Sequence, residues 1–128
     1  HKLARADFQS ALDQVTDVDG VPVLAALVSA PDANTLREMA DWFRDKVQNG
    51  VVVLGTVVDG KPLLIAAATK QLVTERGIHA GNLVRDLARM VGGGGGGRPD
   101  MAQAGGRDPD KLAAALAQVP ALLKAMMH

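Results

Sequence analysis

Apolar residues recur along this chain in two patterns, one typical of helices and one typical of buried strands. Over residues 2–17 the apolar side chains fall every three or four positions, which predicts an amphipathic helix. Residues 21–29 form a nearly continuous apolar run, as expected for a strand covered on both faces. Pro22 stands near its start, where a missing N–H costs little. The segment 17–20 between them is predicted to be a turn.

A second helix is predicted to begin between Pro31 and Asn34. Either Asp32 or Asn34 can cap it, because a short side-chain oxygen can accept a hydrogen bond from a free N–H of the first turn. The Asn49-Gly50 pair is typical of a helix end. The stripe expected to be buried consists of Leu36, Met39, Ala40, Phe43 and Val47.

Two strands joined by a tight turn are predicted next. Residues 51–58 are rich in β-branched side chains, and the apolar pattern resumes over 61–69. Asp59-Gly60 between them is a strong hairpin signal, because both central residues of such a turn must tolerate positive φ. These strands are expected to be antiparallel neighbours. The preceding strand–helix–strand unit is expected to form a parallel crossover.

The last third of the chain contains a run of glycines between two predicted helices. Residues 81–91 carry a helical stripe, and Gly92 to Gly97 follow without interruption. The final helix begins at Asp108-Pro109, and Pro120 is expected to kink it or to begin a short last helix. The order is α-β-α-β-β-α, a glycine-rich loop with room for a short strand after it, then α. This order predicts an α/β class fold, a single mixed-sheet domain with an N-terminal helical stem remnant.

Composition narrows the classes of function. Lys plus Arg equals Asp plus Glu, at 14 each, so any binding to nucleic acid must come from a local basic patch. The chain has no cysteine, which excludes disulfides and thiolate metal sites and fits a cytoplasmic protein. The sequence shows no apolar run of the roughly 20 residues that span a bilayer, so no membrane partner is expected.

The six glycines allow two interpretations. They could form a flexible linker, as glycine-rich tracts often do. Alternatively, a backbone without Cβ atoms can lie flush against a ligand or turn its N–H groups toward an anion. The phosphate-binding pattern GxxxxGK[ST] is not met, because Arg98-Pro99 follows Gly97 where lysine and Ser or Thr are required.

The residues around the glycines are basic but carry no catalytic pattern. Arg85 and Arg89 lie one turn apart on the helix that leads into the glycines. With Lys70 at the end of a strand, Arg76 in the loop after it, Arg98 and Arg107, they could form a basic rim. His79 precedes a helix without an obvious carboxylate partner, so a capping histidine is favoured over a catalytic one. Trp42 is interpreted as packing against another helix, such as the N-terminal one.

The stretch Gly92 to Gly106, GGGGGGRPDMAQAGG, resembles the C-terminal signature of alanyl-tRNA synthetases. The segments 70–74, 80–84 and 108–112 are also similar to that family, and a looser similarity extends through the predicted strands upstream. The resemblance implies that residues 1–18 are the end of a helical stem. It implies that residues 19–128 are a DHHA1-like globular domain.

In that family, the module holds the outer corner of the tRNA and tethers it between aminoacylation and editing. The resemblance therefore implies tRNA(Ala) and the parent's catalytic and editing domains as partners, with self-association in some members. It implies no catalytic residue, metal or cofactor in this fragment. The RNA-contacting residues expected from the resemblance and the basic rim are Lys70, Arg85, Arg89, Gly92, Gly93, Gly94, Gly95, Gly96, Gly97, Arg98, Gln103 and Arg107.

Two other functions stay open at this point. Phosphoesterases of the DHH type use a similar module to hold a nucleotide end. They typically have a histidine after the glycines, where this chain has Arg98, and the Asp-His-His metal-binding domain is missing here. A purely dimerising module is the third possibility, and it would require the first helix and an exposed apolar face to dominate.

Overall fold

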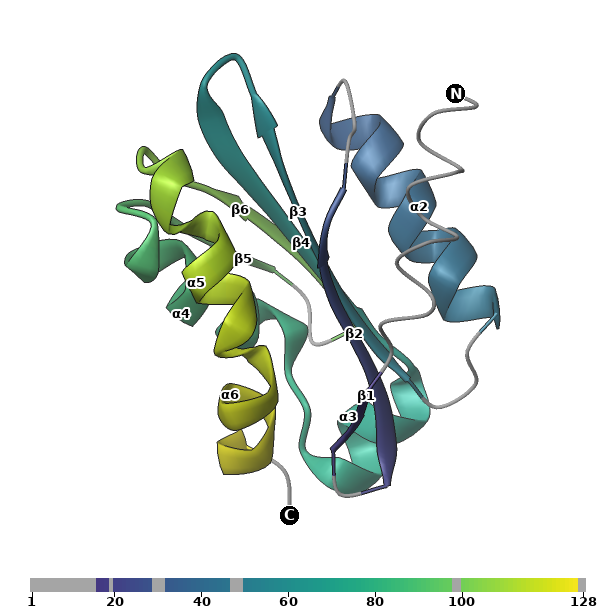
Figure 1. The fold of residues 1–128 in the computed structure, drawn as a ribbon. Helices are drawn as coiled ribbons and strands as arrows, with labels where there is room; N and C mark the ends of the chain where they lie inside the picture. Colours follow the sequence, from purple (N-terminus) through teal and green to yellow (C-terminus); the bar gives the residue numbers. More distant parts are fainter. Residues whose placement is uncertain (1–15, 19, 29–31, 47–49, 98–99, 127–128) are drawn as a thin grey trace.

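A computed structural model describes residues 16–18, 20–28, 32–46, 50–97 and 100–126. Six strands and several helices alternate along them (Figure 1). The strands are β1 (Thr16–Val18), β2 (Val21–Leu27), β3 (Val51–Val58), β4 (Lys61–Ala68), β5 (Gly94–Gly97) and β6 (Met101–Gly105). The helices are α2 (Ala33–Lys46), α3 (Lys70–Arg76), α4 (Ala80–Met90), the 3₁₀ turn η1 (Pro109–Lys111), α5 (Leu112–Ala117) and α6 (Val119–Met126).

All six strands join one mixed sheet in the order β1-β2-β3-β4-β6-β5. β2 and β3 pair in parallel through the crossover helix α2, and the other neighbours are antiparallel. The single mixed-sheet α/β class expected from the sequence is therefore confirmed. The glycine strand β5 lies at one edge of the sheet, and β1 lies at the other.

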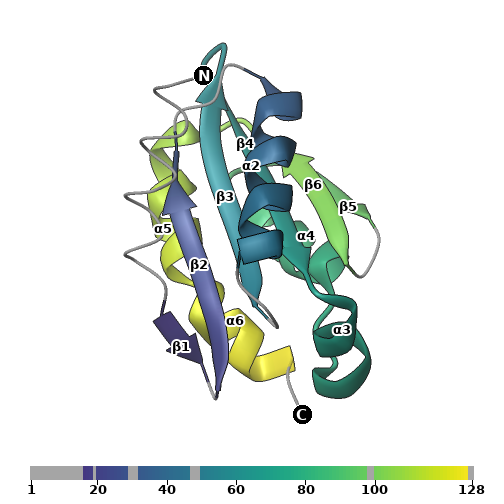
Figure 2. The same ribbon diagram turned by 90° about the vertical axis from the view of Figure 1, so that its right-hand side faces the viewer.

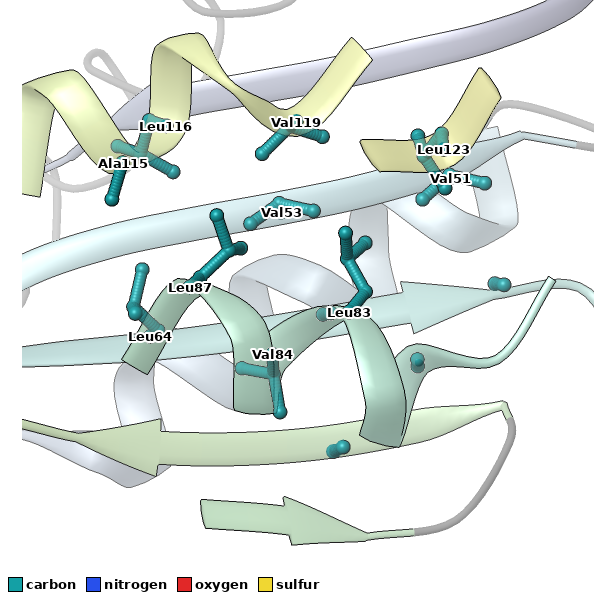
Figure 3. Packing of buried hydrophobic residues seen from close by; sticks show 14 of the residues in the cluster. Val51, Val53, Leu64, Leu83, Val84, Leu87, Ala115, Leu116, Val119 and Leu123 are labelled. Atoms are coloured by element: carbon teal, nitrogen blue, oxygen red, sulfur yellow. The ribbon is translucent and has the colours of Figure 1, made fainter. Parts of the chain in front are cut away.

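Helices cover the two faces of the sheet unequally. On one face α2 packs over β3 and β4 around Leu24, Leu54 and Ile65 (Figure 2). On the other face α4, α5 and α6 enclose a larger core (Figure 3). That core is built mostly from aliphatic side chains, including Val51, Val53, Leu64, Leu83, Val84, Leu87, Leu116, Val119 and Leu123. The apolar side chains of the last two helices, Leu112, Leu116, Val119 and Leu123, are all buried there.

The hairpin and the last helix break follow the expected local chemistry. Asp59 and Gly60 have φ of 53° and 75°, which is the backbone that a tight β3–β4 turn requires. β3 and β4 pair from Val51 opposite Ala68 to Val58 opposite Lys61. Pro120 stands at the second position of α6, so it begins a short final helix, one of the two alternatives that the sequence allowed.

The prediction of a helix over residues 2–17 is wrong for residues 16 and 17, the two that the structure describes. Thr16 and Asp17 belong to β1, which pairs antiparallel with the start of β2, and residues 2–15 lie outside the described part. The turn expected over 17–20 is confined to its end, where Gly20 has φ of 87°. Helical periodicity cannot exclude a short edge strand, because three residues are too few to show a period of two.

A further helix, α3, was not expected from the sequence. Lys70 is its first residue and does not end a strand, and Arg76 is its last residue and does not lie in a loop. The helix is one to two turns long, and Leu72 with the following Ile78 anchors it in the core. Packing of these two side chains stabilises a segment too short to be helical by propensity alone.

Asp32, not Asn34, caps α2. Its carboxylate Oδ1 accepts a hydrogen bond from the N–H of Thr35 at 2.8 Å. This hydrogen bond favours the ionised form and therefore lowers the pKa of Asp32 below its ordinary value of 3.8.

The Asp32 cap should make part of the stability depend on acid pH. A carboxylate with a lowered pKa in the folded state stabilises the fold above its unfolded pKa, and this contribution is lost as pH falls through the folded pKa. As the pH is lowered from about 5 to about 2, we expect the urea denaturation midpoint of Asp32→Asn to fall less than that of the parent protein. Asparagine keeps a capping oxygen, so the two proteins should have similar midpoints at neutral pH. Parallel pH profiles would contradict this assignment of the cap.

No helix within the described ranges is both long and apolar enough to cross a membrane.

Candidate nucleic-acid interface

The glycine run is an edge strand and not a loop over Gly94 to Gly97. Each of these residues pairs antiparallel with β6, from Gly94 opposite Gly105 to Gly97 opposite Ala102. The sequence did not predict this strand, because glycine has a poor intrinsic preference for strands and offers no side chain to pack. The pairing with β6 and the covering helix α4 overcome that preference.

The two faces of β5 are not equivalent. A Cβ on Gly95 would overlap the Ala104 Cβ and lie 2.6 Å from the Ala104 Cα, and a Cβ on Gly97 would lie 2.9 Å from the Ala102 Cβ. A Cβ on Gly94 would meet no atom within 4 Å. Side chains alternate between the faces of a strand. Gly95 and Gly97 are therefore required by packing on the α4 side, whereas Gly94 borders open space on the other side.

Helix α4 lies against β5 and holds it in place. A Cβ on Gly81 would come 2.6 Å from the carbonyl oxygen of Gly97, so this glycine lets the helix approach the strand closely. At the other end of the helix, the N–H of Gly93 donates to the carbonyl of Ala88 at 2.8 Å. The pattern of apolar residues did not predict this role of Gly81. A glycine in the first turn of a helix lowers helix stability, so its presence is a signal for close packing.

On the α2 side, the sheet face over β5 and over Gln103 of β6 is not covered by that helix, whereas Met101 at the start of β6 is buried in the core beneath it. Figure 2 shows α2 in front of β3 and β4, with β6 and β5 beside it. Gln103 stands opposite Gly96 in the register and is exposed, and Gly105 opposite Gly94 is half-buried. The predicted contact residue Gln103 therefore shares this open face with the glycines.

Arginines flank the glycine strand on its α4 side. Arg85 is exposed and stands one helical turn after Gly81, so it lies on the flank of α4 that borders β5. Arg89 is also exposed, one turn farther along and farther round toward solvent. The exposed Arg107 lies at the beginning of β5, where its N–H donates to the carbonyl of Val91 at 2.8 Å.

The structure does not gather every predicted contact residue at one place. Lys70 is exposed at the start of α3, beyond the end of β4, where the N–H of Ala68 donates to the backbone carbonyl of Asp100. It thus lies near the end of β5, away from Arg107 at the beginning. Arg98 lies outside the described residues, so its predicted role is untested.

Acidic groups limit the positive charge at the beginning of β5. The Asp108 carboxylate approaches Gly92, which has φ of 74°, and it lies 4.0 Å from Lys111 Nζ in an exposed ion pair. Such exposed pairs contribute little to stability. Across the described ranges, no three histidine or acidic side chains come together as metal ligands. The local chemistry is therefore that of backbone amides and scattered guanidinium groups.

His79 is the capping residue of α4, as the sequence favoured. Its Nδ1 accepts a hydrogen bond from the N–H of Asn82 at 3.1 Å. Its own N–H donates to Met126 Sδ at 3.3 Å, which connects α6 to the start of α4. The cap is structural, and it fixes the end of α4 that touches Gly97.

Removing this cap should destabilise the domain by a predictable amount. We expect His79→Ala to lower the free energy of unfolding by about 1 kcal/mol, the typical contribution of a helix N-cap. His79→Asn should retain most of that stability, because its side-chain oxygen can accept the same hydrogen bond. Urea denaturation of both variants measures the difference. If His79→Ala and His79→Asn lose the same free energy of unfolding, His79 stabilises the fold by packing and not by the capping hydrogen bond.

The fold and the glycine strand agree with a known family. The DHHA1 domain model matches residues 20–125, so the chain belongs to the DHHA1 domain family. Its relatives include the alanine–tRNA ligase of Desulfitobacterium hafniense (strain Y51), 54% identical over 123 residues that cover 96% of this chain and 14% of that protein. The alanine–tRNA ligase of Roseiflexus sp. (strain RS-1) is 55% identical over 124 residues, which cover 97% of this chain and 14% of that protein.

This chain thus spans about 14% of the length of these relatives. Among solved structures, it is similar to the C-Ala domain from Aquifex aeolicus alanyl-tRNA synthetase, with a TM-score of 0.77 and 25% identity. That match covers 86% of this chain and 97% of the other. The resemblance to the C-terminal module of alanyl-tRNA synthetases is therefore confirmed.

A second solved structure shares the fold. The DHH domain of a member of the s1p family of ribosomal proteins has a TM-score of 0.55 and 14% identity to this chain. The match covers 96% of this chain and 31% of the other. At this identity the likeness concerns the fold alone, so it does not favour a phosphoesterase function.

Proposed function

We propose that this chain is the non-catalytic C-terminal module of an alanyl-tRNA synthetase, and that it binds the elbow of tRNA(Ala). In this role it tethers the tRNA in the cytoplasm while the acceptor end moves between aminoacylation and editing. The catalytic and editing domains of the same enzyme are its partners. The matches to alanine–tRNA ligases and to a C-Ala domain support the proposal.

One structural observation carries the proposal furthest. β5 is an edge strand of four glycines, and exposed arginines lie along its flank and at its beginning. An edge strand presents N–H and C=O groups that no neighbouring strand occupies. Because glycines have no side chains, those N–H groups can approach a phosphate closely. The positive guanidinium of Arg85 can then hold the negatively charged phosphate in place.

The mode of recognition follows from RNA chemistry. Proteins often bind folded RNA by its shape and backbone, and phosphate contacts position the RNA without reading sequence. The chain is neutral overall and has few aromatic residues, so strong electrostatic binding and extensive base stacking are not expected. A weak contact is sufficient for tethering, because other domains of the same enzyme raise the effective concentration of tRNA.

The proposal predicts weak binding with a shallow dependence on salt. If about two phosphates are neutralised, affinity for tRNA should fall about tenfold between about 50 and 200 mM salt. Fluorescence anisotropy with labelled tRNA(Ala) measures this dependence. A fall of a thousandfold or more would indicate many phosphate contacts and contradict the small interface proposed.

Two competitors test the elbow assignment. An acceptor minihelix that lacks the D arm should compete poorly with full tRNA, since it has no elbow. Single-stranded DNA should also compete poorly. Preference for single strands would overturn the proposal in favour of the nucleotide-end binding seen in DHH-type phosphoesterases.

A further inference from the structure

The direction in which each glycine of β5 points its backbone groups follows from the ladder between β4 and β6. In an antiparallel ladder, pairs that exchange both N–H···O=C bonds alternate with pairs whose N–H and C=O groups point away from each other. At one end of this ladder the N–H of Ala68 donates to the carbonyl of Asp100 at 2.9 Å, and at the other the N–H of Gly106 donates to the carbonyl of Pro62 at 3.1 Å. Every second residue of β6, counted from Asp100, therefore bonds to β4, and the residues between them point toward β5.

Gly95 is turned away from β6. Gly94 and Gly96 stand opposite the β6 residues that point toward β5, so these two glycines bond to that strand. Gly95 stands between them, opposite Ala104, which belongs to the set that bonds to β4. The N–H and C=O of Gly95 therefore point outward from the edge of the sheet, as do those of Gly97.

Helix α4 occupies both ends of this outer edge and leaves its middle open. At the beginning, the N–H of Gly93 donates to the carbonyl of Ala88 at 2.8 Å. At the end, Gly81 lies against the carbonyl oxygen of Gly97, because a Cβ there would come within 2.6 Å of it. Gly95 is exposed, and none of the described residues forms a hydrogen bond with its outward N–H or C=O.

Arg85 lies level with Gly95. Gly81, Arg85 and Ala88 are spaced by four and three residues, so they form one stripe along α4. The two ends of this stripe contact the end of β5 and the residue just before its beginning. Arg85 is the exposed residue between these two contacts, beside the middle of the strand. A guanidinium, a free N–H and a free C=O thus meet at one place on the edge.

These three groups require a ligand that both accepts and donates hydrogen bonds. A phosphate oxygen can accept from the N–H of Gly95 and from Arg85, but it offers no donor to the neighbouring carbonyl. A ribonucleotide supplies that donor in its 2′-hydroxyl, which DNA lacks. A peptide strand also carries both kinds of group, but its recognition relies on pockets for alternate side chains, and the glycines of β5 form none. The positive charge of Arg85 also favours the polyanion.

We propose that Gly95 and Arg85 together hold one ribonucleotide of the tRNA and distinguish RNA from DNA. The N–H of Gly95 and the guanidinium of Arg85 bind a phosphate, and the carbonyl of Gly95 accepts a hydrogen bond from the 2′-hydroxyl. The inference rests on the proposed function and adds to it the chemical basis by which the edge selects RNA. It also limits the contact to one nucleotide at the middle of β5, because α4 covers the two ends.

Amide hydrogen exchange measured by NMR tests the directions of the backbone groups without any RNA. In the free protein, the amide of Gly95 should exchange with solvent at least about tenfold faster than those of Gly94 and Gly96, which bond to β6. Adding tRNA(Ala) should slow the exchange of Gly95. Equal exchange rates for the three amides in the free protein would overturn the proposal.

Single 2′-O-methyl groups, scanned through the D and T loops of tRNA(Ala), test the contact with the carbonyl. The methyl group removes the hydroxyl donor and leaves every phosphate in place. We expect one position to lose about tenfold in affinity by fluorescence anisotropy, the effect of one lost hydrogen bond at a desolvated contact. At that position the losses from methylation and from Arg85→Ala should not add, because both act on the same nucleotide. Lys124→Ala, on α6, is the control and should give additive effects.

The possible failures are distinguishable. If unmodified tRNA binds and every methylated position binds equally well, the carbonyl contact is wrong and the proposed function stands. If unmodified tRNA does not bind, both the inference and the proposed function fail. If hexaglutamate slows the exchange of Gly95 and tRNA does not, the edge binds a peptide strand, and the assignment to RNA is overturned.

Discussion

Gly95→Ala is expected to lower the free energy of unfolding by about 2–3 kcal/mol, a typical effect of adding a methyl group where neighbouring atoms leave no room for it. The added Cβ would overlap that of Ala104 across the β5–β6 pair. A Cβ atom is fixed by its own backbone, so the two Cβ atoms can move apart only if β5 and β6 move apart. Urea denaturation followed by circular dichroism measures the loss.

The neighbouring glycine provides a matched control. Gly94→Ala introduces the same methyl group on the open face, where no atom lies within 4 Å, so stability should change by about 0.5 kcal/mol or less. The proposed function predicts that this variant binds tRNA more weakly although it remains folded. Equal destabilisation by the two substitutions would contradict the inequivalence of the two faces of β5.

Arg85→Glu is expected to weaken tRNA binding at low salt by about tenfold, or about 1.4 kcal/mol. The substitution removes a guanidinium beside the glycine strand and brings a carboxylate toward the phosphates. Because Arg85 is exposed on α4, its loss should change the free energy of unfolding by only about 0.5 kcal/mol. Anisotropy at low salt measures the affinity, and the difference from the parent should shrink as salt rises.

The control for Arg85 is a charge reversal on another part of the molecule. Lys124 is exposed on α6, which packs beside α4 and β1 and not on β5. Lys124→Glu changes net charge by the same amount, so it should lower affinity much less. If both reversals weaken binding equally, the effect comes from net charge, and Arg85 is not at the interface.

The sequence was informative about the candidate site but incomplete. It indicated the glycines, Arg85 and Arg89, because a run of six glycines beside arginines is unusual in composition, and the family resemblance added Gln103. It could not show that Gly95 serves packing while Gly94 faces open space. That distinction requires the register of β5 against β6, a pairing between segments that local preferences do not encode. It also could not show that Lys70 lies away from Arg107.

By itself, the sequence determined the elements whose local signals agree with their environment. The β3–β4 hairpin follows from Asp59-Gly60, the two capped helices follow from Asp32 and His79, and the mixed sheet follows from its apolar runs. Tertiary structure alone decided β1, α3 and the glycine strand. Each of these is too short or too unfavourable to form by propensity. The glycine strand and α3 are stabilised by partners distant in sequence, and β1 by its pairing with β2 and its contact with α6. Packing therefore decides that the glycines form the edge strand that carries the proposed function. The glycines themselves and the arginines beside them can be read directly from the amino-acid sequence.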